Sequence, residues 1–588
     1  MKKYLAVFFL LAAVSCAKFD EMSKNPYALY DAPSEEYIHP IMFKTQYNLI
    51  SVFRSNTVLL MQYGVSTNSE VSSRVIDNYN IPEGNTDDVW ADLYLQLGNA
   101  SAMYDKALKE EDRPMQAIAM ILKSFLITQI SDTYGDVPFS ESCGLAVGSA
   151  DKYYTAYDTQ KDIYRNVVIM LEEANEILCE LDRSNETSDA VKRYSFSPAC
   201  DKVFGGSFDL WHRFGNSLYA RVLMRIAMKV IDEDGGVLEL GDEKWESVSV
   251  KSKLSELYSN FENDGADYPQ MRSISDRPLV PFSDQNETEH TPFYTITSGN
   301  WNTVAVSDVL CRWMLDTNEF YDEDLELKYY EWKASSKGGH IEDPRYDCWW
   351  RKVNGMPVHL QNETRAKFLD THLSSSGNSK VGRMVRGKNA DGVPEPSGIT
   401  GKVYDLQNAP YYALMQFSEL LFIYSEAGAR GWIGAVSGLD AYTELFKKGI
   451  TASILEWNPY VDENSDEVVA YVSYCVSQQN YSGTPFSSEN ALEAILTEKW
   501  LANFFIGVES WCDYRRTGYP ILRTDGPAAA NNHILPTRMR YPSDELYRNP
   551  SSYPEALNRW LGGTNNIQTD VWWADTAESK EIRLKGRQ

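Results

Sequence analysis

Apolar residues recur at steps of three and four positions over several long stretches of the chain. In residues 160–182 the apolar positions form one continuous face: Ile163, Val167, Met170, Leu171, Ala174, Ile177, Leu178 and Leu181. This spacing predicts an amphipathic helix, and Thr159 with Asp162 three positions later predicts its N-terminal cap. The same periodicity predicts helices over 115–131, 209–231, 411–430, 439–450 and 490–506. Asn490 and Glu493 are expected to cap the last of these.

Four stretches between these helices have no helical period and are rich in Gly, Pro, Asn, Ser and Asp: 64–88, 235–306, 334–410 and 519–588. They contain many aromatic residues, so we expect ordered loops that carry function. The helix pairs between them are expected to stack into an α-solenoid, giving a mainly α fold with long irregular loops and little β-structure. Because no low-complexity tract or clean linker interrupts the chain, residues 41–588 are predicted to form a single domain.

The first residues have the pattern of a secretory signal. Lys2 and Lys3 precede an apolar run from Tyr4 to Val14, which is too short to span a bilayer. Ala13-Val14-Ser15-Cys16 resembles a bacterial lipoprotein box, which predicts a signal peptide over 1–15, a lipidated (palmitate-bearing) Cys16 and a tether over 16–40. The acidic stretch after Cys16 loosely resembles an export signal to the outer face of the outer membrane. The alternatives are a plain signal peptide with an incidental cysteine and a solvated tether.

The net charge, the cysteines and the absence of catalytic motifs each make some classes of function less suitable for this chain. The net charge of −27 makes nucleic-acid binding improbable as a main role and argues mildly against polyanionic glycans as ligands. Seven cysteines remain after Cys16 without a C-x-x-C pair, so most are expected to be buried. Residues 462–466 begin like a calcium loop, but Glu467 stands where that loop needs a glycine for its turn. A structural calcium ion therefore has no motif to support it, and we predict no cofactor. No zinc-protease or serine-hydrolase motif occurs, which favours a protein that is not an enzyme.

Several segments occur in an order that resembles one known family. They are Ser131–Ser140 (SDTYGDVPFS), Leu210–Arg225 (LWHRFGNSLYARVLMR), Asp343–Arg345 (DPR), Ser418–Ala427 (SELLFIYSEA), Glu498–Pro520, Pro536–Pro542 (PTRMRYP) and Val571–Trp573 (VWW). Together they resemble the SusD/RagB-like nutrient-binding outer-membrane lipoproteins. Tyr424 and Ser425 depart from the family's small apolar pair, and 459–468 is an acid-rich insert.

The resemblance implies degenerate tetratricopeptide-type helix pairs and a SusC-like TonB-dependent transporter as partner. The recognisable motifs are expected to build the scaffold. Arg515 and Arg516 beside Asp513 and Glu509 suggest a buried ion-pair network.

Ligand contacts are expected in the loops, where aromatic faces and amide groups occur together. The candidates are Asn68 and Tyr79 in one loop, Tyr294, Asn300 and Trp301 in a second, and Trp350 in a third. Trp301, in a polar turn, is the best single candidate for an exposed ring, and packing against the scaffold is its alternative.

The sequence therefore favours a cell-surface protein, anchored by lipid to the outer membrane, that binds an oligosaccharide or peptide and delivers it to the transporter. Two alternatives stay open. One is a surface glycoside hydrolase or peptidase, because a catalytic carboxylate pair has no sequence signature. The other is a transporter lid without a ligand of its own.

Overall fold

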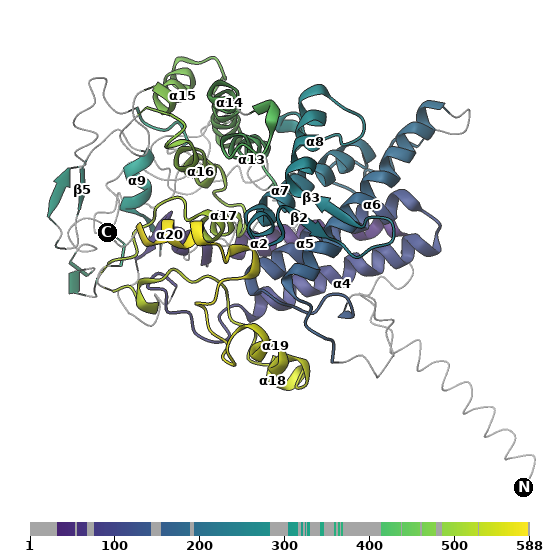
Figure 1. Ribbon diagram of the computed structural model, residues 1–588, viewed down its shortest axis with the longest axis horizontal. Helices are drawn as coiled ribbons and strands as arrows, with labels where there is room; N and C mark the ends of the chain where they lie inside the picture. Colours follow the sequence, from purple (N-terminus) through teal and green to yellow (C-terminus); the bar gives the residue numbers. More distant parts are fainter. Residues whose placement is uncertain are drawn as a thin grey trace, which may run out of the picture.

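The computed structural model is built mainly from helices (Figure 1). The structure describes residues 32–52, 56–67, 76–142, 154–187, 193–282, 304–314, 413–436, 438–458, 461–477, 485–526 and 528–585, with short stretches between 319 and 367.

The helices of the described residues are α2 (Ile38–Val52), α3 (Val58–Leu60), α4 (Asp87–Lys109), α5 (Arg113–Tyr134), α6 (Gln160–Thr187), α7 (Phe208–Asp234), α8 (Val250–Asn263), α9 (Asp308–Met314), α13 (Phe417–Ala429), α14 (Leu439–Trp457), α15 (Asp466–Ser477), α16 (Ala491–Ala502), α17 (Glu509–Thr517), α18 (Glu545–Arg548), α19 (Ser552–Trp560) and α20 (Ala577–Lys585). The 3₁₀ turns are η1 (Ser34–Tyr37), η6 (Ile274–Asp276), η11 (Gly434–Val436), η12 (Asn531–His533) and η13 (Trp572–Ala574). Three antiparallel ladders pair β1 (Gly64–Ser66) with β4 (Val304–Val306), β2 (Val237–Glu239) with β3 (Ser247–Ser249), and β5 (Glu319–Tyr321) with β6 (Leu327–Tyr329).

Helices α4 to α8 form a first group in which each helix packs on the next along the chain. The start of α5 is fixed by Asp112, whose carboxylate accepts a hydrogen bond from the Met115 N–H at 3.1 Å. The helix ends at Gly135, which has a φ of 93°. A Cβ atom there would lie 2.2 Å from the Trp560 ring, so this turn requires glycine.

Helices α13 to α16 form a second group, in which α13 contacts both α14 and α16, and α15 packs on α14. Figure 1 shows this group beside α7 and α8, with α17 near the centre of the molecule. The predicted mainly α scaffold of successive helix pairs is confirmed.

Buried ion pairs join the two groups. On α7, Arg221 pairs with Glu419 of α13 at 2.6 Å, and Arg225 pairs with Glu509 of α17. On α17, Arg516 binds the Glu426 carboxylate of α13 with two hydrogen bonds of 2.6 and 2.7 Å. These side chains are at most 5% exposed. The predicted network is therefore present and fixes α7, α13 and α17 to one another.

Arg515 differs from the prediction, because it donates to carbonyl groups and not to a carboxylate. Its Nη1 donates to the carbonyl oxygens of Asp132 and Thr537 at 2.6 and 3.0 Å. The guanidinium group lies 3.6 Å from the centroid of the Trp511 ring and 4.8 Å from that of Trp573. It therefore joins α17 to the C-terminal segment through hydrogen bonds and ring stacking.

Most predicted helices are present, with boundaries that shift by a few residues, but sequence periodicity missed several others. Helices α2, α4, α19 and α20 were not predicted, α8 lies inside the stretch 235–306, and α15 begins within the acid-rich insert 459–468. The stretch 490–506 ends as a helix at Ala502, and α17 then begins at Glu509. Some of these helices do have apolar residues at helical spacing, such as Val250, Leu254, Leu257 and Tyr258 in α8, but they lie in stretches whose Gly, Pro, Asn, Ser and Asp content favoured loops.

The two predicted N-terminal caps have opposite outcomes. Thr159 caps α6 as predicted, because its hydroxyl accepts from the Asp162 N–H at 3.1 Å and donates to the Asp162 carboxylate at 2.6 Å. The side-chain cap predicted at Asn490 is wrong. Its Oδ1 accepts from the Ser487 N–H at 2.8 Å and its Nδ2 donates to the Pro485 carbonyl at 2.9 Å, so it closes the preceding turn.

The packed domain begins before residue 41. The Ser34 hydroxyl donates to Glu110 at 2.6 Å, and Ile38 at the start of α2 is fully buried. The part of the expected tether from 32 to 40 thus belongs to the domain, whereas the signal peptide and Cys16 lie outside the described residues. Within the described chain, no helix combines the length and apolarity needed to cross a bilayer.

The cysteines of the described chain are mostly buried, as expected. Cys179, Cys311, Cys475 and Cys512 are buried, and Cys200 is half-buried. The His212 side chain of α7 is buried as well, and its Nε2 lies 2.8 Å from the Asn175 side-chain oxygen.

Candidate functional site

Strands β1 and β4 bring two of the predicted ligand loops to one place. Ser66 lies opposite Val304 in the antiparallel ladder, and Gly64 lies opposite Val306. Residue 67 follows β1 and residue 303 precedes β4, so the two loops leave the ladder at the same end. Sequence patterns predicted the loops separately, and only this long-range pairing shows that they share an anchor.

Tyr79 is a buried support of this region and offers no exposed ring to a ligand. Its side chain is fully buried, and its hydroxyl accepts from Gln62 Nε2 at 2.9 Å. The ring meets the His359 ring edge-on with centroids 4.6 Å apart. Burial raises the pKa of the Tyr79 phenol well above its usual value, so the hydroxyl stays neutral. The expectation of a stacking surface at Tyr79 is thus not met, because the loop folds the ring inward.

Gln62 connects three distant parts of the chain. Its Nε2 donates to the Tyr79 hydroxyl and to the Arg523 carbonyl, and its Oε1 accepts from the Arg523 N–H at 3.1 Å. Its carbonyl accepts from the Ser307 hydroxyl, directly after β4. The Arg523 guanidinium in turn donates to Asp308 at 3.2 Å. These bonds hold residues 62, 79, 307–308 and 523 in a single arrangement.

The Asp308 carboxyl group occupies a buried position in this cluster. Burial raises its pKa above the usual range, although the neighbouring Arg523 guanidinium lowers it in part. Asp308 is 2% exposed, so its charge depends on the pair with Arg523. The pair positions the start of α9 next to the ladder.

Backbone strain gathers around the same cluster. Gln62, Tyr79 and His359 have φ values of 54°, 60° and 57°, and the successive residues Asn531, Asn532 and His533 have values of 57°, 56° and 58°. These are six of the nine non-glycine residues with positive φ in the described part of the chain. Each costs on the order of 1–2 kcal/mol relative to ordinary backbone. Strain of this kind persists where the surroundings impose it and is frequent at binding sites.

The segment 523–533 binds the strained residues to one another. The Ala530 N–H donates to the Asn78 carbonyl at 2.8 Å, and the Ala528 N–H donates to the His359 carbonyl at 2.9 Å. His359 belongs to the same long loop as the predicted Trp350. A described residue of the third loop therefore contacts Tyr79, which bonds to Gln62 two residues before β1.

A small polar cavity of about 190 Å³ adjoins this segment. Thr524 and His533 line one side, where His533 Nδ1 lies 3.0 Å from the Thr524 carbonyl. Gln568 and Asp570 line it as well, and Asp570 accepts two hydrogen bonds from Arg583 at 2.8 and 3.0 Å. The cavity has room for a few ordered waters or a small polar group.

The other predicted ligand residues, Asn68, Tyr294, Asn300, Trp301 and Trp350, lie outside the described residues and stay predictions. Within the described residues no group of three metal-ligating side chains occurs. The arrangement holds the described loop ends in place, because its buried hydroxyl and amide groups bond to one another.

Sequence reasoning missed the anchoring residues Gln62, Arg523 and Asn531–His533. Two adjacent asparagines at 531–532 are a weak signal for left-handed backbone, because asparagine adopts it more readily than most residues. Gln62 and Arg523 carry no local signal, since their roles arise from contacts more than 400 positions apart.

Comparison with known proteins supplies the family. The SusD-like family model described as "Starch-binding associating with outer membrane" matches residues 26–237 and 341–542. No curated protein matches the chain.

Solved structures share the fold over nearly the whole chain. A chitin-binding SusD homologue from Flavobacterium johnsoniae is 20% identical and aligns with a TM-score of 0.62, over 92% of this chain and 98% of its own. A SusD homologue from Bacteroides fragilis is 21% identical, with a TM-score of 0.59 over 91% and 99% of the two chains. One from Bacteroides uniformis is 20% identical, with a TM-score of 0.59 over 91% and 99%. The two matched segments of the family model cover more than half of the sequence, and the chain belongs to the SusD-like family.

Proposed function

We propose that the protein is a surface lipoprotein that captures an oligosaccharide nutrient and delivers it to a SusC-like TonB-dependent transporter. The observation that carries this proposal is the match to a family described as starch-binding and associated with the outer membrane. A peptide is the second ligand class. In this proposal the protein binds its ligand without cleaving it.

The β1–β4 ladder supports a ligand site formed by the loops that it anchors. Sugars bind to aromatic faces with amide groups alongside, and Asn68, Tyr294, Asn300, Trp301 and Trp350 supply these groups in the loops. The hydrogen-bonded cluster around Gln62 would hold the loop ends in place before the ligand arrives. A site organised in advance loses less conformational entropy on binding.

Outer-membrane attachment would come from acyl chains on Cys16. Several acyl chains on one residue hold a protein at a membrane surface where a single chain binds only marginally. Anchoring on the cell surface would place the ligand loops near the transporter, which the family resemblance supplies as partner.

The direct test measures binding and cleavage by the soluble chain that starts after Cys16. Calorimetry would compare chitin, starch and host-type oligosaccharides with peptides, and chromatography of the recovered ligand would detect cleavage. We expect binding of a neutral oligosaccharide without turnover, weakened by Trp301→Ala. Tyr547→Ala, which removes a 79% exposed ring on α18, serves as the control.

Each other result assigns a different role. Turnover of the ligand would favour the surface hydrolase or peptidase. No binding to any compound, together with co-purification with a TonB-dependent transporter, would favour a lid without its own ligand. Binding that Trp301→Ala leaves unchanged would place the ligand away from the predicted loop.

A further inference from the structure

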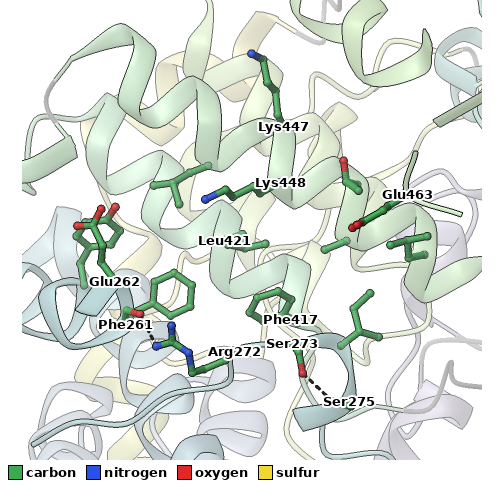
Figure 2. Close-up of a pocket in the computed structure, with 16 residues that line it drawn as sticks. Phe261, Glu262, Arg272, Ser273, Ser275, Phe417, Leu421, Lys447, Lys448 and Glu463 are labelled. Carbon is green, nitrogen blue, oxygen red and sulfur yellow. Dashed lines mark hydrogen bonds between the residues drawn. The ribbon is translucent and has the colours of Figure 1, made fainter. Parts of the chain in front are cut away.

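A second hollow, formed by elements other than the β1–β4 ladder, lies between α8, α13 and α14. Its volume is about 780 Å³, within the range of about 300–1,000 Å³ that is usual for small-molecule pockets. Residues 272–275 and the exposed Glu463 complete its wall (Figure 2). All of the residues that line it belong to the described chain.

The inner surface of this hollow is apolar. Leu421 of α13 and Leu445 of α14 line it and are buried, with exposed fractions of 3% and 5%. Phe261 and Phe417 are half-buried and form an aromatic wall, with ring centroids 6.4 Å apart. Figure 2 shows Phe261 of α8 close to Phe417 and Leu421 of α13. An apolar ligand body of ring size would lose water on this surface and gain contact with both rings.

Cationic groups surround the apolar surface. Figure 2 shows Lys448 reaching from α14 and Arg272 from the facing loop, with Phe261 between them. Lys447 is the third cation of the lining. Carboxylates accompany these cations, because Glu262 and Glu463 also line the hollow and Lys447 pairs with Glu444 at 2.7 Å.

Two of the three cations remain available to a ligand. Arg272 pairs with Asp264 at 3.1 Å, but their side chains are 37% and 64% exposed, so the pair is weak. Lys448 is exposed, and no carboxylate of the described residues lies within ion-pair distance of it. An anionic group beside Lys448 would thus gain a charge contact without breaking a buried pair.

The aromatic wall depends on Tyr424 of α13. Its ring packs on Tyr258 and Phe261 with centroids 5.1 and 5.3 Å away. Its hydroxyl donates to the Gln270 side-chain oxygen, which fixes the ring. A small residue at 424 would leave both rings without this support.

We propose that this hollow binds a small organic carboxylate with an apolar or ring-shaped body. The body would lie against Phe261, Phe417 and Leu421, and the carboxylate would lie beside Lys448. This site is additional to the loop site of the proposed function and does not depend on it.

Two sources share this chemistry: a C-terminal apolar amino acid of a peptide and a uronic acid of a glycan. The test uses the soluble chain with N-acetyl-phenylalanine, its uncharged amide, and glucuronic acid, each followed by saturation-transfer NMR and calorimetry. We expect N-acetyl-phenylalanine to bind at least about fivefold more tightly than its amide, as one partly exposed charge contact predicts. Stronger binding of glucuronic acid would assign the glycan source, and weaker binding would assign the peptide source.

Three variants test whether N-acetyl-phenylalanine binds in this hollow. Lys448→Met should weaken acid binding about fivefold and leave amide binding unchanged. Thr451→Trp, which fills the hollow from α14, should abolish both. Lys251→Met removes an exposed lysine of α8 that does not line the hollow and should change nothing. Because these are substitutions of side chains that reach the surface, circular dichroism should show unchanged folding.

Three results would overturn the proposal: no carboxylate binds, the amide binds as tightly as the acid, or Thr451→Trp has no effect. The Trp301→Ala variant separates this site from the loop site. It should leave N-acetyl-phenylalanine binding unchanged, whereas Lys448→Met should leave neutral oligosaccharide binding unchanged. These two variants therefore show separately whether the loop site and the second hollow bind their ligands.

Discussion

Glu426 offers the most direct test of the buried network that joins the helix groups. Its carboxylate accepts two hydrogen bonds from Arg516 and one from Arg430 at 2.8 Å, and the carboxylate is fully buried. Burial alone would raise the pKa of Glu426, but the two guanidinium groups lower it from 4.5 to about 2. This difference corresponds to about 3 kcal/mol of stability.

The sign of this contribution fixes its pH dependence. Because the folded pKa lies below the unfolded value, the stability is fully present above pH 4.5 and is lost as the pH falls towards 2. Glu426→Gln removes the titrating group and leaves Arg516 with Asp513 at 2.9 Å as its remaining carboxylate. We therefore expect the variant to be less stable than the wild type by about 3 kcal/mol near neutral pH. The difference should shrink as the pH falls below 4.5.

Urea unfolding followed by circular dichroism would measure this difference from neutral pH down to about pH 3. Glu180→Gln is the matched control, because Glu180 pairs with Arg113 at 3.0 Å with both side chains about half exposed. Its effect should stay below about 1 kcal/mol. A Glu426→Gln protein as stable as the wild type at neutral pH would refute the reasoning, and so would a difference that does not change with pH.

Three further predictions concern the backbone and the loop anchor. Gly135→Ala should lower the free energy of unfolding by about 2 kcal/mol or more, because the added Cβ meets an aromatic ring. Gly205→Ala has open space around it and should cost about 1 kcal/mol. Thermal unfolding of the two variants would measure both values. Asn532→Val should destabilise the strained turn by about 1–2 kcal/mol in urea unfolding, whereas Asn532→Gly should be tolerated because glycine accepts positive φ freely. Tyr79→Phe should cost about 1 kcal/mol, since a buried hydrogen bond is lost, and Tyr547→Phe on the exposed surface should cost nothing measurable; equal melting temperatures for the two would contradict the anchoring role.

The scaffold was largely predictable because its signals are local. The apolar periodicity of α5, α6 and α7 survives in the structure, and the motif arginines Arg221 and Arg225 occupy the helix junction. Helices such as α8 and α15 were missed although their apolar residues have helical spacing, because the loop-forming residues around them favoured irregular stretches.

The candidate site was less predictable, because long-range contacts form it. The sequence identified the stretches 64–88 and 235–306, but the ladder that joins them consists of three residues on each side. Tyr79 shows why the sequence does not decide whether an aromatic ring in a loop is exposed. An aromatic residue in a polar loop has the same sequence pattern whether its ring faces solvent or, as here, packs against His359.

The family motifs should therefore identify the residues that build the scaffold, and not the residues that contact a ligand. In the described chain, motif residues such as Gly135, Arg221 and Glu509 are committed to packing and buried ion pairs, so any ligand chemistry must come from other positions. Tyr424 links the two kinds of role: its bond to Gln270 holds it within the helix packing, and its ring supports the wall of the second hollow. A change of the Tyr424 side chain should thus alter what the hollow between α8 and α14 accepts, without touching any residue that lines the loop site.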